Sequence, residues 1–192
     1  LKTGMLATPE AIEVVAERLR AVPRVKKVVD PVMVATSGAK LISDEAVAVL
    51  RERLLPLATL ITPNLPEAAA LLGHPVGPGA GMVAAARELA QRFGCAVLVK
   101  GGHAVVDGEG GIAEDVLFDG RRVRVFGKPV VPHPVSTHGT GCSLAAALAA
   151  ELARGASLAR AVEGAKDFVF DAIKTSYRVG ENCGVLGMPR ER

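Results

Sequence analysis

The sequence predicts an α/β fold with a mostly parallel central sheet flanked by helices, and three observations favour it. Segments rich in β-branched residues alternate along the chain with segments whose apolar residues have helical spacing. Apolar residues make up 49% of the chain but aromatic residues only 3%, and strands buried on both faces use aliphatic side chains. The chain has 192 residues, enough for one core. We therefore expect a single domain over residues 1–192.

The first half of the chain alternates strand and helix signals. Thr8 is an N-cap hydroxyl followed by proline at the first helical position, and Ser43 and Asn64 are suited to the same place before two further helices. Apolar spacing and terminal glycine then predict helices at 8–19, from 43 to about 55, and from 64 to 73. Strands are predicted at 26–34, from its β-branched residues, and at 58–62, and residues 1–6 read like the end of a strand that enters a loop.

The second half predicts the remaining elements. Residues 82–93 form an amphipathic pattern that Gly94 closes, and 96–100 read as a buried strand. Asp119 and Gly120 join two polar-alternating runs, so we expect an antiparallel hairpin of 115–118 and 121–126 toward one edge of the sheet. Two more helices are expected, from 141 to about 154 and from 158 to about 175, before an irregular, glycine-rich tail.

Charge and cysteine content exclude several classes of protein. The formal charge is +3, from 23 basic and 20 acidic residues, and no basic run exceeds two residues, so no nucleic-acid partner is expected. The three cysteines are widely spaced, which argues against a disulfide framework and favours a cytoplasmic setting. No apolar run reaches membrane-spanning length and no signal peptide opens the chain, so no membrane partner is expected.

Polar and glycine residues gather where the predicted strands end. Ligands of open parallel sheets bind at the carboxyl ends of the strands, and the groups found there are Asp30; Thr62 with Asn64 and Glu67; Lys100 with Gly101 and Gly102; and residues 136–143. These groups suit phosphate or magnesium. Structural interpretations remain open: Asp30 as a turn former, Asn64 and Glu67 as a capping box, and Lys100 as a surface lysine. The capping and magnesium interpretations of Glu67 are compatible.

Residues 136–143 give the sharpest signal. Gly139 and Gly141 let the backbone approach a ligand, and the helix that follows offers unpaired N–H groups and a partial positive charge to an anion. Such donors stabilise the charge that develops on a transferring phosphoryl group. Cys142 lies in the same field, so we expect it to act as a base or to orient a hydroxyl. The alternative is a tight turn in which Cys142 packs as a small apolar residue.

Other common nucleotide and metal sites fit poorly. His133, His138 and Cys142 are close in sequence, but their spacing matches no strong zinc pattern. The sequence has no Walker lysine motif, and no glycine fingerprint of dinucleotide enzymes follows an early strand.

Four motifs in order resemble the hydroxymethylpyrimidine/phosphomethylpyrimidine kinases of thiamine biosynthesis, in the ribokinase-like superfamily: Asp30-Pro31-Val32-Met33-Val34, residues 62–68, Val99-Lys100-Gly101-Gly102-His103 and residues 137–142. The resemblance covers Lys2 to about Tyr177. It implies ATP-dependent phosphorylation of the hydroxymethylpyrimidine and then of its monophosphate. It also implies an anion hole at Gly139, Thr140, Gly141 and the catalytic Cys142; Mg²⁺ at Glu67 and Asp30; and nucleotide contacts at Lys100, Gly102, Thr137, Asn64 and Val130.

The amino end departs from the resembled family. Its members normally begin with one more strand-helix-strand section, which grips the pyrimidine, and here the chain starts at Leu1 rather than Met. We therefore expect a preceding section that completes the substrate pocket. One alternative is a pyridoxal kinase, which an aspartate at position 142 would have favoured. Another is a non-catalytic binding domain that has lost its substrate section. The resemblance also makes a homodimer possible.

Overall fold

A six-stranded sheet forms the centre of the molecule. The computed structural model describes residues 1–34, 41–102, 111–181 and 183–188. The strands lie side by side in chain order: β1 (Lys2–Thr3), β2 (Val28–Val29), β3 (Leu60–Ile61), β4 (Ala96–Lys100), β5 (Ile112–Phe118) and β6 (Val123–Pro129). β1 to β4 are parallel, whereas β5 and β6 are antiparallel to their neighbours. The mostly parallel α/β fold and the antiparallel hairpin at one edge are therefore confirmed.

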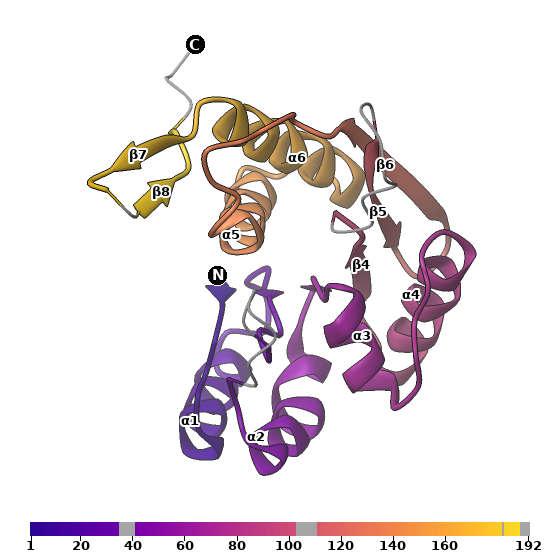
Figure 1. The fold of residues 1–192 in the computed structure, drawn as a ribbon. Coiled ribbons are helices and arrows are strands. Elements are labelled where there is room, and N and C mark those ends of the chain that lie inside the picture. Colours follow the sequence, from indigo (N-terminus) through magenta and orange to yellow (C-terminus); the bar gives the residue numbers. More distant parts are fainter. Residues whose placement is uncertain (35–40, 103–110, 182, 189–192) are drawn as a thin grey trace.

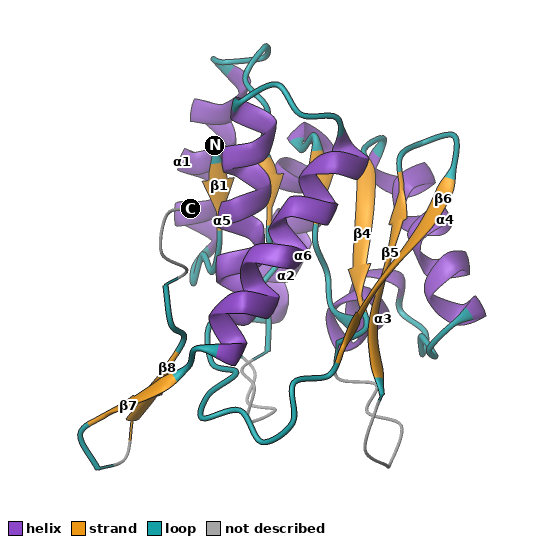
Figure 2. Ribbon diagram, turned by 90° about the horizontal axis from the view of Figure 1, so that it is seen from above, coloured by secondary structure: helices purple, strands orange, loops and turns teal. Residues whose placement is uncertain are grey.

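Helices cover both faces of this sheet. They are α1 (Pro9–Arg20), α2 (Asp44–Val49), α3 (Leu65–Leu72), α4 (Ala80–Phe93), α5 (Thr140–Ala153) and α6 (Leu158–Lys174). Figure 1 shows α1 to α4 on one side of the strands and α5 with α6 on the other; Figure 2, turned by 90°, looks at the sheet from the side of α5 and α6. None of the helices in the described residues is long and apolar enough to cross a membrane.

Alternating side chains of the strands build two cores. Val29, Ile61 and Val97 pack on the side of α1 to α4, while Val28 and Leu60 pack on the side of α5 and α6. All five are at most 1% exposed. Because both faces of the parallel strands are buried, the strands need aliphatic residues at successive positions, and this explains the composition of the sequence.

The helix ends follow the local signals of the sequence. The hydroxyl of Thr8 accepts a hydrogen bond from the N–H of Ala11, and that of Ser43 accepts one from Ala46. Gly73 ends α3 with φ = 86°, in the left-handed region that favours glycine. These predicted helix boundaries are confirmed.

Two predicted segments differ in the structure. The helix expected to reach residue 55 leaves α geometry after Val49 and continues as a π-helical turn (Leu50–Leu54) and a 3₁₀ turn (Leu55–Leu57). Pro56 has no N–H to donate, so the regular ladder cannot continue through it. The strand expected at 26–34 pairs with its neighbours in the sheet only at Val28–Val29, and Asp30-Pro31 follows directly.

The tail was wrongly predicted to be irregular. It forms an antiparallel pair, β7 (Tyr177–Val179) and β8 (Cys183–Val185), which projects from the end of α6 (Figures 1 and 2). Gly180 takes a positive φ of 70° in the connecting turn. The sequence did not predict this pair because strands of three residues are too short to show an alternating apolar pattern, and the segment is polar and rich in glycine.

Candidate active site

The carboxyl ends of β2, β3 and β4 bring three polar side chains together. Oδ1 of Asp30 accepts hydrogen bonds from the hydroxyl of Thr62 and from the ammonium of Lys100, each at 2.8 Å. Asp30 and Thr62 directly follow β2 and β3, and Lys100 is the last residue of β4. Parallel strands end at the same edge of a sheet, so residues far apart in sequence meet there.

Glu67 joins this group from the first turn of α3. The N–H of Glu67 donates to Oδ1 of Asn64, and the N–H of Asn64 donates to Oε2 of Glu67, both at 2.8 Å. This is a complete capping box. The same Oε2 lies 4.0 Å from Nζ of Lys100. The capping role of Glu67 therefore coexists with its place in the charged group.

Asp30, Glu67 and Lys100 form what we call the carboxylate–lysine cluster. The side chains of the two acids are 1% and 3% exposed and that of the lysine 14%. The surface-lysine interpretation of Lys100 is therefore wrong. Burial raises the pKa of the Glu67 carboxyl, and this effect outweighs the lowering by the nearby Lys100 ammonium. One ammonium faces two carboxylates, so the cluster favours a further cation.

The cluster also lies against the beginning of α5. A methyl group added at the Cα of Gly141 would lie 3.4 Å from Nζ of Lys100. Gly139 precedes the helix with φ = 85°, and Thr140 begins it. Cys142, in the first turn, is exposed to solvent. The unpaired N–H groups of this helix start and the Lys100 ammonium thus lie side by side, an arrangement suited to a phosphate.

The other predicted site residues are less closely connected. Val130 follows β6, where its N–H donates to the carbonyl of Gly111, while Gly102 and Thr137 are exposed. Hydrogen bonds and ion pairs among the described residues do not link these residues or Cys142 to the carboxylate–lysine cluster. Their roles stay predictions. His103, in the third motif, lies outside the described residues.

One polar residue near this edge, Thr3, lies in a segment, Lys2 to Met5, that the family resemblance sets at the border of the substrate pocket, but it was not itself predicted as a site residue. The hydroxyl of Thr3, at the end of β1, is buried and has no hydrogen-bond partner within the described part of the chain. The carbonyl of Thr3 accepts the N–H of Asp30, which sets Thr3 beside the cluster. No sequence signal marks it, because a threonine at a strand end is common in any sheet.

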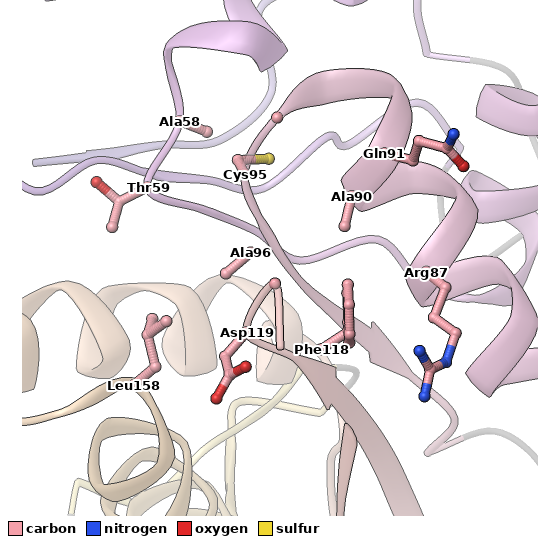
Figure 3. Close-up of a pocket in the computed structure, with 12 residues that line it drawn as sticks. Ala58, Thr59, Arg87, Ala90, Gln91, Cys95, Ala96, Phe118, Asp119 and Leu158 are labelled. Carbon is pink, nitrogen blue, oxygen red and sulfur yellow. The ribbon is translucent and has the colours of Figure 1, made fainter. Parts of the chain in front are cut away.

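A separate cavity lies at the other ends of the strands. It has a volume of 690 Å³, and its lining includes Thr59 and Cys95, which precede β3 and β4, and Phe118 at the end of β5 (Figure 3). The guanidinium of Arg87, also in the lining, packs over the Phe118 ring at 5.1 Å from its centroid. None of the predicted site residues lines this cavity. The cavity and the carboxylate–lysine cluster are therefore different places.

Comparison with known proteins shows the family of the chain. A family model described as phosphomethylpyrimidine kinase matches residues 1–187. A hydroxymethylpyrimidine/phosphomethylpyrimidine kinase of Synechococcus elongatus is 42% identical over 187 residues, and the match covers 97% of this chain and 69% of that protein. A thiamine biosynthesis bifunctional protein of Geobacter sulfurreducens is 44% identical over 184 residues, which cover 96% of this chain but 36% of that protein.

Solved structures agree with the sequence relatives. The ADP complex of Bacillus subtilis pyridoxal kinase superposes with a TM-score of 0.86 at 37% identity, covering 97% of this chain and 69% of that one. The chain thus spans between about a third and about two thirds of the length of these relatives.

Proposed function

Because the chain belongs to the phosphomethylpyrimidine kinase family, with its ribokinase-like fold, we propose that it carries the phosphate-transfer part of such a kinase. The reaction moves the γ-phosphoryl group of ATP to the hydroxyl of a hydroxymethylpyrimidine, and then a second one to the resulting monophosphate. The observation that carries this proposal is the Lys100 ammonium, which lies between two buried carboxylates and the beginning of α5.

Lys100 and α5 supply positive charge from two sides. The ammonium lies 2.8 Å from Asp30 and close to Gly141, and the helix start offers N–H groups that have no partner within the helix. Phosphoryl transfer needs little covalent help from a protein, because positioning and charge stabilisation supply most of the catalysis. In the proposed reaction the oxygens of the transferring group lie against these donors. The nucleotide roles of Gly102, Thr137, Val130 and Asn64 belong to the same proposal.

Asp30 and Glu67 fit a magnesium ion that is shared with the nucleotide. Mg²⁺ in kinases is typically held by one or two carboxylates together with waters and phosphate oxygens. The described ranges contain no group of three or more acidic, histidine or cysteine side chains that could hold a metal ion. The two carboxylates therefore suit an ion whose other ligands are waters and phosphate oxygens. When bound, the ion would neutralise charge on the phosphates. Asp30 and Glu67 would hold it, with Lys100 beside both carboxylates.

Cys142 is proposed to receive the proton of the attacking hydroxyl. The bond between the γ-phosphorus and the β,γ-bridging oxygen breaks, a bond to the substrate oxygen forms, and the hydroxyl proton passes to the thiolate of Cys142. The first turn of α5 places this side chain beside the helix N–H groups, and it is accessible to a substrate.

Pyridoxal is the second candidate substrate. The Bacillus subtilis pyridoxal kinase superposes at a TM-score of 0.86, so the fold and a nucleotide site suit that substrate as well. Cys142 favours the pyrimidine, because the family resemblance implies aspartate at this place in most ribokinase-like enzymes and pyridoxal kinases. We also propose a cytoplasmic location and a possible homodimer, as in the resembled family.

The decisive experiment measures phosphorylation by the protein expressed from its complete reading frame. Mg-ATP is supplied with the hydroxymethylpyrimidine, its monophosphate or pyridoxal, and the products are separated by chromatography. We expect both pyrimidine steps to exceed pyridoxal phosphorylation. Cys142→Ala is expected to lower kcat at least about 100-fold while leaving the affinity for ATP nearly unchanged.

Other outcomes would reject parts of the proposal. If pyridoxal is the better substrate, the second candidate replaces the first. Unchanged turnover in Cys142→Ala removes the proposed proton transfer. Nucleotide binding without turnover of any substrate would favour the non-catalytic alternative.

A further inference from the structure

A second buried ion pair lies beside the site, on residues that the proposed reaction does not use. Nζ of Lys166, on α6, donates to Oδ2 of Asp115, on β5, at 2.5 Å and to the carbonyl of Ala113 at 3.2 Å. The lysine is 8% exposed and the aspartate 5%. Burying two charges costs desolvation free energy, which their attraction offsets only when the two groups are well oriented and hydrogen-bonded. A buried pair is therefore weak evidence for a role in stability alone, and another role has to be considered.

Asp115 uses its other oxygen to hold the end of β4. Its Oδ1 accepts the N–H of Gly101 at 3.0 Å, and the same N–H lies 3.0 Å from the carbonyl of Glu114. On the preceding residue, the N–H of Lys100 donates to the carbonyl of Pro63 at 2.8 Å. The backbone that carries the Lys100 side chain is therefore fixed on two sides, by β5 and by the segment after β3.

Asp115 is also the cross-strand partner of Lys100. The antiparallel register of β4 and β5 sets these two residues directly opposite each other. Side chains at such positions have Cβ atoms about 5 Å apart, within easy reach of an ion pair. The ammonium of Lys100 nevertheless lies against Asp30, and Lys166 neutralises Asp115 instead. Two lysines and two aspartates are thus sorted into two separate pairs along one edge of the sheet.

We propose that Lys166 is a positioning residue for the nucleotide site. By neutralising Asp115, it holds that carboxylate on the N–H of Gly101 and prevents Asp115 from attracting the ammonium of Lys100. Lys100 then stays with Asp30, beside the start of α5, where it meets the phosphates. The part of this inference that concerns phosphates rests on the proposed function. The part that concerns Gly101 does not.

The test compares a single with a double variant. Lys166→Met keeps most of the side-chain volume and leaves Asp115 unpaired, so Lys100 should turn toward it. We expect the dissociation constant for Mg-ADP, measured by calorimetry, to rise about tenfold. Adding Asp115→Asn should restore it to within about twofold, because an amide oxygen still accepts the Gly101 N–H and no longer attracts Lys100.

A matched control separates this effect from the general attachment of α6. Lys128 on β6 pairs with Asp167, the next residue of the same helix, but the side chains are 35% and 52% exposed. Lys128→Met should leave Mg-ADP binding unchanged. If Lys166→Met binds Mg-ADP as the parent protein does, or if the double variant binds as weakly as the single one, the inference is wrong.

A second measurement keeps this inference separate from the proposed function. Absence of Mg-ADP binding by the parent protein would reject the proposed function alone. Hydrogen exchange at the Gly101 amide then decides the inference. We expect exchange to be at least about tenfold faster in Lys166→Met and unchanged in Lys128→Met. Equal exchange in the two variants would overturn the role of Lys166.

Discussion

The ammonium of Lys100 lies 2.8 Å from Oδ1 of Asp30, although 70 residues separate the two along the chain. The same oxygen accepts the hydroxyl hydrogen bond of Thr62, so the ends of three consecutive parallel strands meet at one atom. Glu67 adds a second carboxylate, 4.0 Å from the ammonium. The lysine is therefore part of the fold as well as part of the site, and removing it should have two consequences.

Lys100→Met should destabilise the protein and change its response to magnesium. Removing one partner of a buried pair leaves an uncompensated charge, which typically costs about 3–5 kcal/mol. We expect a loss of this size in the free energy of unfolding, measured with urea. Added MgCl₂ should recover more stability in the variant than in the parent protein, since a cation then replaces the ammonium.

A companion variant checks this explanation. Asp30→Asn combined with Lys100→Met should be more stable than Lys100→Met alone, because one of the two buried negative charges is gone. A double variant that is less stable than the single one would contradict the charge argument. It would point to lost packing of the lysine stem instead.

Glu67→Gln should become relatively more stable as the pH rises. Burial raises the pKa of the Glu67 carboxyl above its ordinary value of 4.5, so the native state holds this proton more tightly than the unfolded chain. The stability from this group is complete below the unfolded pKa and is lost as the pH rises through the folded one. Glutamine keeps the capping box but does not titrate.

The measurement is the free energy of unfolding of both proteins between pH 4 and pH 7. The difference should grow in favour of Glu67→Gln across this range, and the variant should need more magnesium for turnover. Glu163→Gln is the control, because the ion pair of Glu163 with Arg160 is exposed and worth less than about 1 kcal/mol. A constant difference, or an unfolded variant, would show that capping is the larger role of Glu67.

Gly101→Ala and Gly102→Ala should differ sharply in stability. A methyl group at Gly101 would lie 2.5 Å from the carbonyl of Glu114, whereas one at Gly102 would meet no atom of the described residues within 4 Å. We expect Gly101→Ala to lose about 1–3 kcal/mol of unfolding free energy, and Gly102→Ala to change by less than about 0.5 kcal/mol. Equal stabilities in urea unfolding would mean that the end of β4 is not held against β5.

The three cysteines should separate into two classes when the native protein reacts with a thiol reagent. Cys142 and Cys183 are exposed, whereas burial raises the pKa of Cys95 to about 12. At pH 8 only roughly one Cys95 in ten thousand is ionised, on the ordinary titration relation. Two thiols should therefore react quickly with a maleimide, and the third only after unfolding. Fast labelling of Cys95, identified by peptide mass spectrometry, would contradict this assignment.

The sequence predicts best where one residue type sets the local backbone. Thr8, Ser43 and Asn64 cap helices, and Gly73 and Gly94 end them, because hydroxyl, amide and glycine chemistry act within a few residues. The π-helical turn after Val49 and the β7–β8 pair were not predicted. Their signals are weak at short range, and packing against the rest of the fold decides them.

The sequence predicted which residues gather at the site, but not how their charged side chains pair. The rule that ligands bind where parallel strands end was enough to group Asp30, Glu67 and Lys100. It could not show which acid each lysine pairs with, because partner choice depends on side-chain directions and register. Lys166 was therefore not distinguished from other lysines on helix surfaces. The roles of Cys142 and Gly102 stay predictions.

The hairpin of β5 and β6 has a consequence for the order in which the molecule folds. Its seven paired positions close over a turn in which the carboxylate of Asp119 accepts the N–H groups of Arg121 and Arg122, whereas β2 and β3 share two positions across some thirty residues of intervening chain. Local ladders lose less chain entropy on closing and form sooner. The hairpin carries Asp115, so we expect the strand that ends in Lys100 to dock onto a hairpin that has already formed. The carboxylate–lysine cluster is then expected to be among the last parts of the chain to become ordered.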